Sequence, residues 1–270
     1  MPGPFEISVD QLTKLVGTPS APVIVDLRIE EDFAQDETLV PGSVRWNFED
    51  FYGLRDFVED RHTVTLCHKG RKISQGVAAQ LRSTGVSVDV LEGGHVTWRE
   101  AGAPVLRWLG AANANDWVTR QRPKVDRIAC PWLIRRFVNP NARILFVPAT
   151  DVSMVAERFD ATPFDVEAVR FSHHGPNCSF DAFLQEFELD YAPLKTMAEI
   201  VRAADTNRLG QNAEASGLLA VLLGLSRMYR DDYAQLEAGM TVCDALFRWA
   251  RDAQNESHDW PNALNAAVSV

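Results

Sequence analysis

Cys67 opens a short, strongly basic segment of the chain. The residues after it read His68-Lys69-Gly70-Arg71-Lys72-Ile73. Positive side chains and free N–H groups at the start of a helix favour the thiolate form of a cysteine. A glycine lets the backbone curl so that several N–H groups converge on one point. The segment therefore predicts a nucleophilic thiolate at Cys67 and a loop, from His68 to Ile73, that binds an anion.

A buried structural cysteine is the alternative for Cys67, since cysteine is among the residue types most often found inside proteins. The basic side chains of the loop argue against it. Burying His68, Lys69, Arg71 and Lys72 together would be costly, because each cation would lose its water. We therefore favour the nucleophile.

A second group of side chains that could bind a metal lies further along the chain. Four residues of ligand type fall within nine positions, namely His173, His174, Cys178 and Asp181. Zinc sites normally repeat a pair of ligands, and this group has no such repeat. Two interpretations stay open: a metal or redox site, or a buried polar cluster in which Ser179 or Asp181 caps a helix.

For a metal site, two further carboxylates are expected to join the group. Asp126 and Asp205 both lie in segments where an acidic residue has no obvious packing role. The ligand set predicted for a divalent metal is therefore His173, Cys178, Asp126 and Asp205.

A basic stretch stands out in this acidic chain. Between Trp117 and Arg143 there are seven basic residues and a single acid, Asp126. Because arginine binds oxyanions through paired N–H groups, Arg120, Arg127 and Arg135 form a candidate anion patch. Solvated arginines that pair with acids elsewhere are the alternative.

The other cysteines are spread along the chain and form no CxxC pair, which predicts neither a disulfide framework nor a zinc ribbon. Cys130 lies at a helix start between Arg127 and Arg135, so it is either an activated thiol or a buried residue of the first turn. Cys243 lies on an apolar helix face and is expected in the core.

Hydrophobic patterning places Cys67 at the end of a strand. A buried strand over Thr63 to Leu66 precedes it, and a helix over Ser74 to Ser83 follows it. Strands that alternate with helices predict an α/β domain, residues 1–110, with a parallel sheet covered by helices. Such sheets place their sites at the carboxyl ends of strands. The other predicted elements are helices over Val9 to Leu15 and Phe48 to Phe57 and strands over Pro22 to Leu27, Ser43 to Trp46 and Ser87 to Leu91.

The stretch from Leu109 to Asp116 is interpreted as a linker to a second domain, residues 117–255, of mixed but mainly α-helical structure. Its predicted strands are Arg143 to Val147 and Ala168 to Phe171. Its predicted helices are Ile128 to Phe137, Asp151 to Phe159, Phe180 to Glu188, Pro193 to Ala204, Ala213 to Tyr229 and Ala234 to Ala253.

Bulk properties limit the function classes. A net charge of −10 argues against general nucleic-acid binding, which needs a basic surplus. The most apolar run, Gly217 to Leu225, is about half of the roughly 20 residues that a membrane helix needs. The first residues resemble no secretory signal. We expect a cytoplasmic protein without nucleic-acid or membrane partners.

The first domain resembles the rhodanese family in several ordered motifs. Val23-Ile24-Val25-Asp26-Leu27-Arg28 is similar to its strand signature, and Pro41-Gly42-Ser43 to its Pro-Gly-Ala turn. The closing motif is similar to Leu91-Glu92-Gly93-Gly94, with Trp98 and Ala101-Gly102-Ala103-Pro104-Val105 after it. The resemblance covers about 100 residues, from about Ile7 to Trp108.

This resemblance implies a sulfurtransferase. Cys67 would carry a persulfide, taking sulfur from a donor such as thiosulfate and passing it to a thiol acceptor without any cofactor. The loop N–H groups would stabilise the charged sulfur, and Arg71 and Lys72 would orient the donor. Asp26 and Arg28 would support the strand ends as an ion pair.

The loop departs from the usual sulfurtransferase pattern by one extra residue, a length that related folds associate with phosphate- or arsenate-sized anions. Cysteine phosphatases, however, need an arginine six positions after the cysteine to hold phosphate. That position is Ile73 here. Sulfur transfer, or thiol chemistry on another oxyanion, remains.

The second domain resembles the C-terminal domain of chromate-resistance proteins of the ChrB type. The resemblance rests on Trp117-Val118-Thr119-Arg120, the block from Lys124 to Phe137, Pro163-Phe164-Asp165, His173-His174-Gly175, Cys178-Ser179-Phe180-Asp181 and Ala204-Asp205-Thr206. It implies a context of resistance to chromate or another oxyanion. The DNA-binding members would need a basic winged helix before this domain, where the rhodanese-like domain stands.

Two function classes follow. In the first, the chain is a sulfurtransferase with a Cys67 persulfide, linked to chromate or oxyanion resistance. In the second, it is a non-catalytic sensor that binds an oxyanion or a metal, with Cys67 as a ligand or redox switch.

Overall fold

The first part of the chain is built on a fully parallel sheet. The computed structural model describes residues 3–110 and 116–256. Its five-stranded sheet has the order β1-β6-β5-β2-β4. The strands are β1 (Glu6–Ile7), β2 (Val23–Asp26), β4 (Ser43–Arg45), β5 (Thr63–Leu66) and β6 (Val88–Leu91). The predicted α/β class is therefore confirmed.

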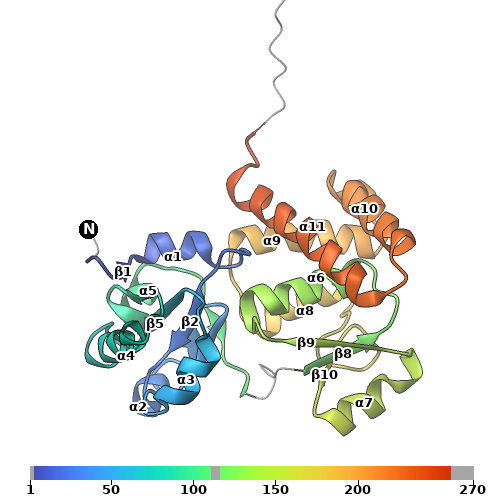
Figure 1. Ribbon diagram of the computed structural model, residues 1–270. Coiled ribbons are helices and arrows are strands. Elements are labelled where there is room, and N and C mark those ends of the chain that lie inside the picture. Colours follow the sequence, from blue (N-terminus) through green and yellow to red (C-terminus); the bar gives the residue numbers. More distant parts are fainter. Residues whose placement is uncertain (1–2, 111–115, 257–270) are drawn as a thin grey trace, which may run out of the picture.

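Helices cover both faces of this sheet (Figure 1). They are α1 (Val9–Leu15), α2 (Glu30–Phe33), α3 (Phe51–Val58), α4 (Lys72–Ser83) and α5 (Gly94–Glu100). Neighbouring residues of a strand face opposite ways, so Ile24 packs in one core with Leu12 of α1, and Val25 packs in another with Val77 of α4. Because both faces are buried, β5 is apolar or uncharged throughout. A small antiparallel pair, β3 (Thr38–Leu39) with β7 (Leu106–Arg107), closes this part.

The second part combines a small parallel sheet with a helical layer. The sheet has the order β10-β8-β9, formed by β8 (Asp116–Arg120), β9 (Arg143–Val147) and β10 (Thr162–Pro163). The helices are α6 (Val125–Leu133), which continues as a π-helical turn over Ile134–Val138, α7 (Val152–Phe159), α8 (Ser179–Glu186), α9 (Ala192–Asp205), α10 (Ala215–Met228) and α11 (Asp232–Asp252). Short 3₁₀ turns cover Ala149–Asp151 and Leu209–Gln211. A mixed, mainly helical architecture is thus confirmed.

The strand predicted over Ala168 to Phe171 is wrong. Ala168 has a φ of +60°, a left-handed conformation that interrupts an extended strand. Only Phe171 pairs, in an isolated bridge with Phe164. Of the predicted linker Leu109 to Asp116, residues 111–115 lie outside the described residues.

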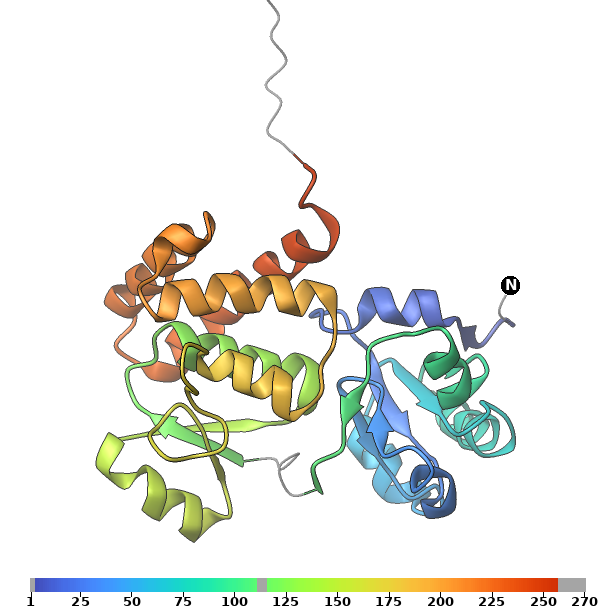
Figure 2. The ribbon, with the colours of Figure 1, turned by 180° about the vertical axis from the view of Figure 1, so that it is seen from behind.

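The two parts pack directly against each other and share one apolar core (Figures 1 and 2). The Gly42 N–H donates to the Phe137 carbonyl oxygen at 2.6 Å, and the Arg107 N–H donates to the Phe187 carbonyl oxygen at 2.9 Å. At Gly17, an added Cβ would lie 2.2 Å from the ring of Phe137. Within the described residues, no helix is both long and apolar enough to cross a membrane.

A buried polar network supports the sheet end beside Cys67. Arg28 donates to both Asp26 carboxylate oxygens, and neither side chain is exposed. Its other guanidinium contacts are the backbone carbonyl oxygens of Asp36 and Thr38 and the Nδ1 atom of His95, at 3.2 Å. Because arginine can only donate, Nδ1 must accept, so His95 is neutral here.

His95 connects this network to the Cys67 turn, since its backbone N–H donates to the Cys67 carbonyl oxygen at 3.0 Å while its ring contacts Arg28. Burial, followed by the positive charge of Arg28, lowers the pKa of His95 to about 4. Protonation of this ring would therefore disrupt the support of the turn.

We expect Gly94→Ala to destabilise the protein more than Gly102→Ala. Both glycines have a left-handed φ, +62° and +65°, so alanine costs roughly 1–2 kcal/mol at either position. At Gly94 the new Cβ would also lie 2.2 Å from the Cys67 carbonyl oxygen, whereas nothing lies within 4 Å at Gly102. Overpacking should add roughly 1–3 kcal/mol at Gly94. Urea unfolding measures both losses, and equal losses would contradict the proposed packing.

We expect acid to destabilise the wild type more than the His95→Gln variant. The folded-state pKa of His95 is depressed, so its stabilising contribution is present above pH 6.5 and is lost as the pH falls towards 4. The loss should reach roughly 2 kcal/mol at pH 4.5. Glutamine can still accept from Arg28 but does not titrate. Unfolding free energies at pH 7.5 and 4.5 test this, and parallel losses in both proteins would refute it.

Candidate functional site

Cys67 lies where the sheet presents its carboxyl ends. It follows β5, which is flanked by the parallel strands β2 and β6, and the chain then turns through residues 68–71 into α4. Its side chain is nearly buried, and the residue is 6% exposed. The Sγ atom lies 3.2 Å from the Ser74 hydroxyl oxygen, which can donate to a thiolate. The predicted position of Cys67 at a strand end is therefore the observed one.

The turn after Cys67 is fixed by close backbone packing. Gly70 has a φ of +62°, and an added Cβ would lie 2.6 Å from the Leu91 carbonyl oxygen and 2.7 Å from the Gly94 amide nitrogen. The Val96 N–H donates to the His68 carbonyl oxygen at 3.0 Å. Only glycine fits at this close approach. The loop is thus held rigidly against the start of α5.

The loop offers unused hydrogen-bond donors. Among the described residues, none accepts a hydrogen bond from the backbone N–H groups of Lys69, Gly70 or Arg71. The side chains of Lys69, Arg71 and Lys72 are exposed and form no ion pair with the described part of the chain. Free N–H groups and unpaired cations in the loop that follows a thiol suit an anionic sulfur or oxygen group.

A shallow cavity of about 880 Å³ adjoins the loop at Lys72 and Ile73. Ile29, Phe48 and Phe51 give it an apolar wall. Ile73, which follows the loop, lines this cavity. It occupies the position at which a cysteine phosphatase would have an arginine.

A second cluster of ionisable groups lies in the other part of the chain. The Nε2 atom of His173 is 3.4 Å from an Asp126 oxygen, 3.2 Å from an Asp205 oxygen and 3.5 Å from an Asp165 oxygen. Asp126 belongs to the first turn of α6, Asp205 ends α9, and Asp165 follows β10. The fold therefore brings together three segments that are far apart in the sequence, since Asp165 and His173 lie in one loop between β10 and α8.

The electrostatics of this cluster are strongly perturbed. Burial raises the pKa of Asp126 to about 6, and burial together with Asp165 raises that of Asp205. Hydrogen bonds to Asp126 and Asp165 raise the pKa of His173 to about 10. Burial opposes ionisation of Asp165, but His173 and Ser179 outweigh it, so the pKa of Asp165 is lowered. The cluster is thus a compact, mostly buried group of charges.

Three of the four predicted metal ligands meet in this cluster. Asp126, His173 and Asp205 offer ligand atoms that all lie within 4.8 Å of one another. Cys178 is not among them, because its thiol is buried next to the start of α8, where burial raises its pKa far above the ordinary value. Asp165 was missed, although it lies in a motif that the sequence singled out.

The neighbouring residues of the predicted cluster have other roles. His174 is exposed and contacts the Arg170 carbonyl oxygen. Asp181 accepts from the Cys178 N–H at 2.9 Å, which caps α8, and also pairs with Arg202. Cys130 and Cys243 are buried; burial raises the pKa of both, to about 12 for Cys243. Neither is an activated thiol.

The predicted arginine patch divides in two. Arg120 and Arg127 both approach Asp165, at 3.6 and 3.4 Å. Arg135 instead pairs with Glu237 at 2.7 Å and donates to the Ala142 carbonyl oxygen. A three-arginine anion patch is therefore not formed, because Arg120 at the end of β8 and Arg127 in α6 meet at Asp165, whereas Arg135 in the π-helical turn pairs elsewhere.

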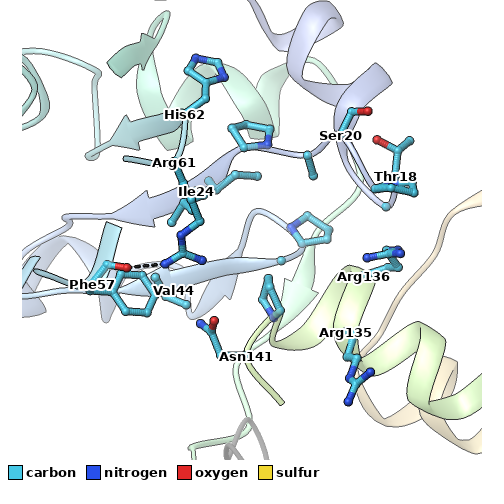
Figure 3. Close-up of a pocket in the computed structure, with 18 residues that line it drawn as sticks. Thr18, Ser20, Ile24, Val44, Phe57, Arg61, His62, Arg135, Arg136 and Asn141 are labelled. Carbon is cyan, nitrogen blue, oxygen red and sulfur yellow. Dashed lines mark hydrogen bonds between the residues drawn. The ribbon is translucent and has the colours of Figure 1, made fainter. Parts of the chain in front are cut away.

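Arg135 lines a cavity of about 350 Å³ between the two parts of the chain, with Arg136 beside it and Arg61 opposite (Figure 3). Each of these cations already has a partner. Arg136 pairs with Asp244, and Arg61 donates to the carbonyl oxygen of Phe57. Arg135 and Arg136 are thus balanced by acids, whereas Arg61 has no acidic partner in the described part of the chain.

Two family models match the two parts of the chain separately. A family model described as the rhodanese-like domain matches residues 8–101, and one described as the ChrB C-terminal domain matches residues 117–250. Protein ChrB of Cupriavidus metallidurans is 38% identical over 133 residues, which are 49% of this chain and 40% of that protein. The chain thus spans less than half of that relative.

Several solved structures resemble about a third to two fifths of this chain. A rhodanese-related protein of Thermoplasma volcanium is 21% identical, with a TM-score of 0.32, over 37% of this chain and 95% of that one. A thiosulfate sulfurtransferase of Pseudomonas aeruginosa is 19% identical, with a TM-score of 0.33, over 39% of this chain and 20% of that one. By the two family models, the chain has a rhodanese-like domain over residues 8–101 followed by a ChrB C-terminal domain over residues 117–250.

Proposed function

We propose that this protein is a sulfurtransferase that carries sulfur as a persulfide on Cys67. The observation that carries the proposal is the loop itself, in which N–H groups without an acceptor among the described residues and unpaired cations directly follow a thiol at the end of the central strand β5. This arrangement would hold the negative charge of a persulfide in place.

Thiosulfate is the donor that suits this loop. The Cys67 thiolate would attack the outer sulfur of thiosulfate, the bond between its two sulfur atoms would break, and sulfite would leave with the electron pair. An acceptor nucleophile, a thiolate or cyanide, would then attack the outer sulfur of the persulfide and release the Cys67 thiolate. Arg71 and Lys72, exposed at the start of α4, would attract and orient the sulfonate group.

The second domain supplies the context of the proposal. Its likeness to a ChrB C-terminal domain favours a role in resistance to chromate or another oxyanion. The competing function is a sensor that binds an oxyanion without turnover. The small exposure of Cys67, 6%, favours that alternative, because a carrier must present its outer sulfur to an acceptor.

We expect Cys67→Ser to abolish the formation of thiocyanate from thiosulfate and cyanide. The rate should fall by more than about a thousandfold, because no covalent carrier remains. After incubation with thiosulfate, mass spectrometry should find a gain of about 32 Da, one sulfur atom, on Cys67. Thiosulfate binding without either product would favour the sensor.

We expect Lys72→Gln to raise the KM for thiosulfate about threefold to tenfold, with a smaller change in kcat. An exposed cation that orients an anion contributes about one factor of ten at most. Lys14→Gln, the same substitution at an exposed lysine of α1, is the matched control and should leave KM unchanged. The same KM in both variants would show that Lys72 does not help to bind the donor.

A further inference from the structure

We propose that Asp126, His173 and Asp205 bind a divalent transition-metal ion within the ChrB C-terminal domain. The site is separate from Cys67 and does not depend on sulfur transfer. Two carboxylates and one imidazole, with no thiolate, suit Mn²⁺, Fe²⁺ or Zn²⁺ rather than a thiophilic ion such as Cu⁺.

The spacing of the ligand atoms fits such an ion. At metal–ligand distances of about 2.1 Å, two ligands of one ion lie about 3 to 4 Å apart. The Nε2 atom of His173 is 3.4 Å from Asp126 and 3.2 Å from Asp205. All three ligand atoms lie within 4.8 Å of one another. Only a small contraction would bring them onto a common ion.

A buried carboxylate oxygen without a partner points to a ligand here. Asp126 is 1% exposed, and its Oδ1 atom accepts no hydrogen bond from the described part of the chain. Its Oδ2 atom accepts from the Ser179 N–H at 2.6 Å. An unsatisfied carboxylate oxygen is costly inside a protein. A metal ion on this carboxylate would supply the missing interaction.

Rigid elements position the proposed ligands. Asp126 lies in the first turn of α6 and Asp205 is the last residue of α9, and the Asp126 N–H approaches the Asp205 carboxylate at 3.4 Å. Asp165 is already engaged, because the Ser179 hydroxyl donates to it at 2.7 Å and Arg127 pairs with it. Asp165 therefore supports Ser179, and its contact with the Nε2 atom of His173, at 3.5 Å, would be given up when that atom binds the ion.

The site has an entry path. The His173 side chain is 41% exposed and lies, with Asp165 and Arg120, at the edge of a cavity of about 580 Å³. An ion could approach His173 from this side. The Arg120 guanidinium at the edge approaches Asp165 at 3.6 Å and so lies beside the proposed site.

The test is calorimetric titration of the full chain, freed of metal by a chelator, with Mn²⁺ and separately with Zn²⁺. One equivalent of at least one ion should bind to the wild type. His173→Ala should weaken this binding at least about a hundredfold, because a direct ligand is lost. His174→Ala, the same change at the adjacent exposed histidine, is the matched control and should bind like the wild type.

A second measurement guards against loss of folding. The ion should raise the Tm of the wild type and of His174→Ala but not that of His173→Ala, since binding to the folded state alone stabilises it. Cys67→Ser should bind the ion normally, which separates this site from sulfur transfer. No binding of either ion to the wild type, or equal binding by the two histidine variants, would overturn the proposal.

Discussion

The rhodanese-like domain depends on one buried cation. Arg28 has no exposed side-chain surface and joins the end of β2, through Asp26, to the backbone near β3 and to His95 at the start of α5. A buried charge of this kind is tolerated only when its N–H groups find partners. Because His95 in turn holds the Cys67 carbonyl oxygen, the position of the thiol depends on this network.

The Cys67 loop shows how a fold can leave backbone groups free without losing stability. The glycines at positions 70 and 94 let two turns approach closely, and the carbonyl oxygens of Cys67 and His68 are satisfied by α5. The N–H groups of residues 69–71 have no acceptor among the described residues. The turn is thus held by its carbonyl groups, while its N–H groups stay without a partner in that part of the chain.

The two domains divide the charge chemistry between them. In the first, cations without an ion pair in the described part of the chain follow the thiol along the loop. In the second, carboxylates surround a histidine and are only partly balanced by Arg120 and Arg127. The apolar core that runs through both domains, with Phe137 seated against Gly17, fixes their relative position. Each site nevertheless lies at the ends of elements of its own domain.

The sequence by itself determined the local frame of the first site. The strand Thr63 to Leu66 and the helix after it follow from short-range hydrophobic patterning, and so does the place of Cys67 between them. The bounds of α1 and β9 were also predicted as observed. Patterning succeeds there because neighbouring residues in the chain decide which face is buried.

The sequence did not predict β8 or β10. Each strand is defined by pairing with a distant segment, β8 with both β9 and β10.

Only the tertiary structure showed how the residues of the second site meet. Asp126 lies in α6, Asp205 ends α9, and Asp165 and His173 lie in the loop between β10 and α8, so hydrophobic patterning did not show that Asp165 belongs with the three predicted ligands. The same reason explains why Cys178 stays apart from the predicted ligands and why Arg135 turns to Glu237. Helix packing brings distant residues together and points near neighbours in different directions, which a linear pattern cannot express.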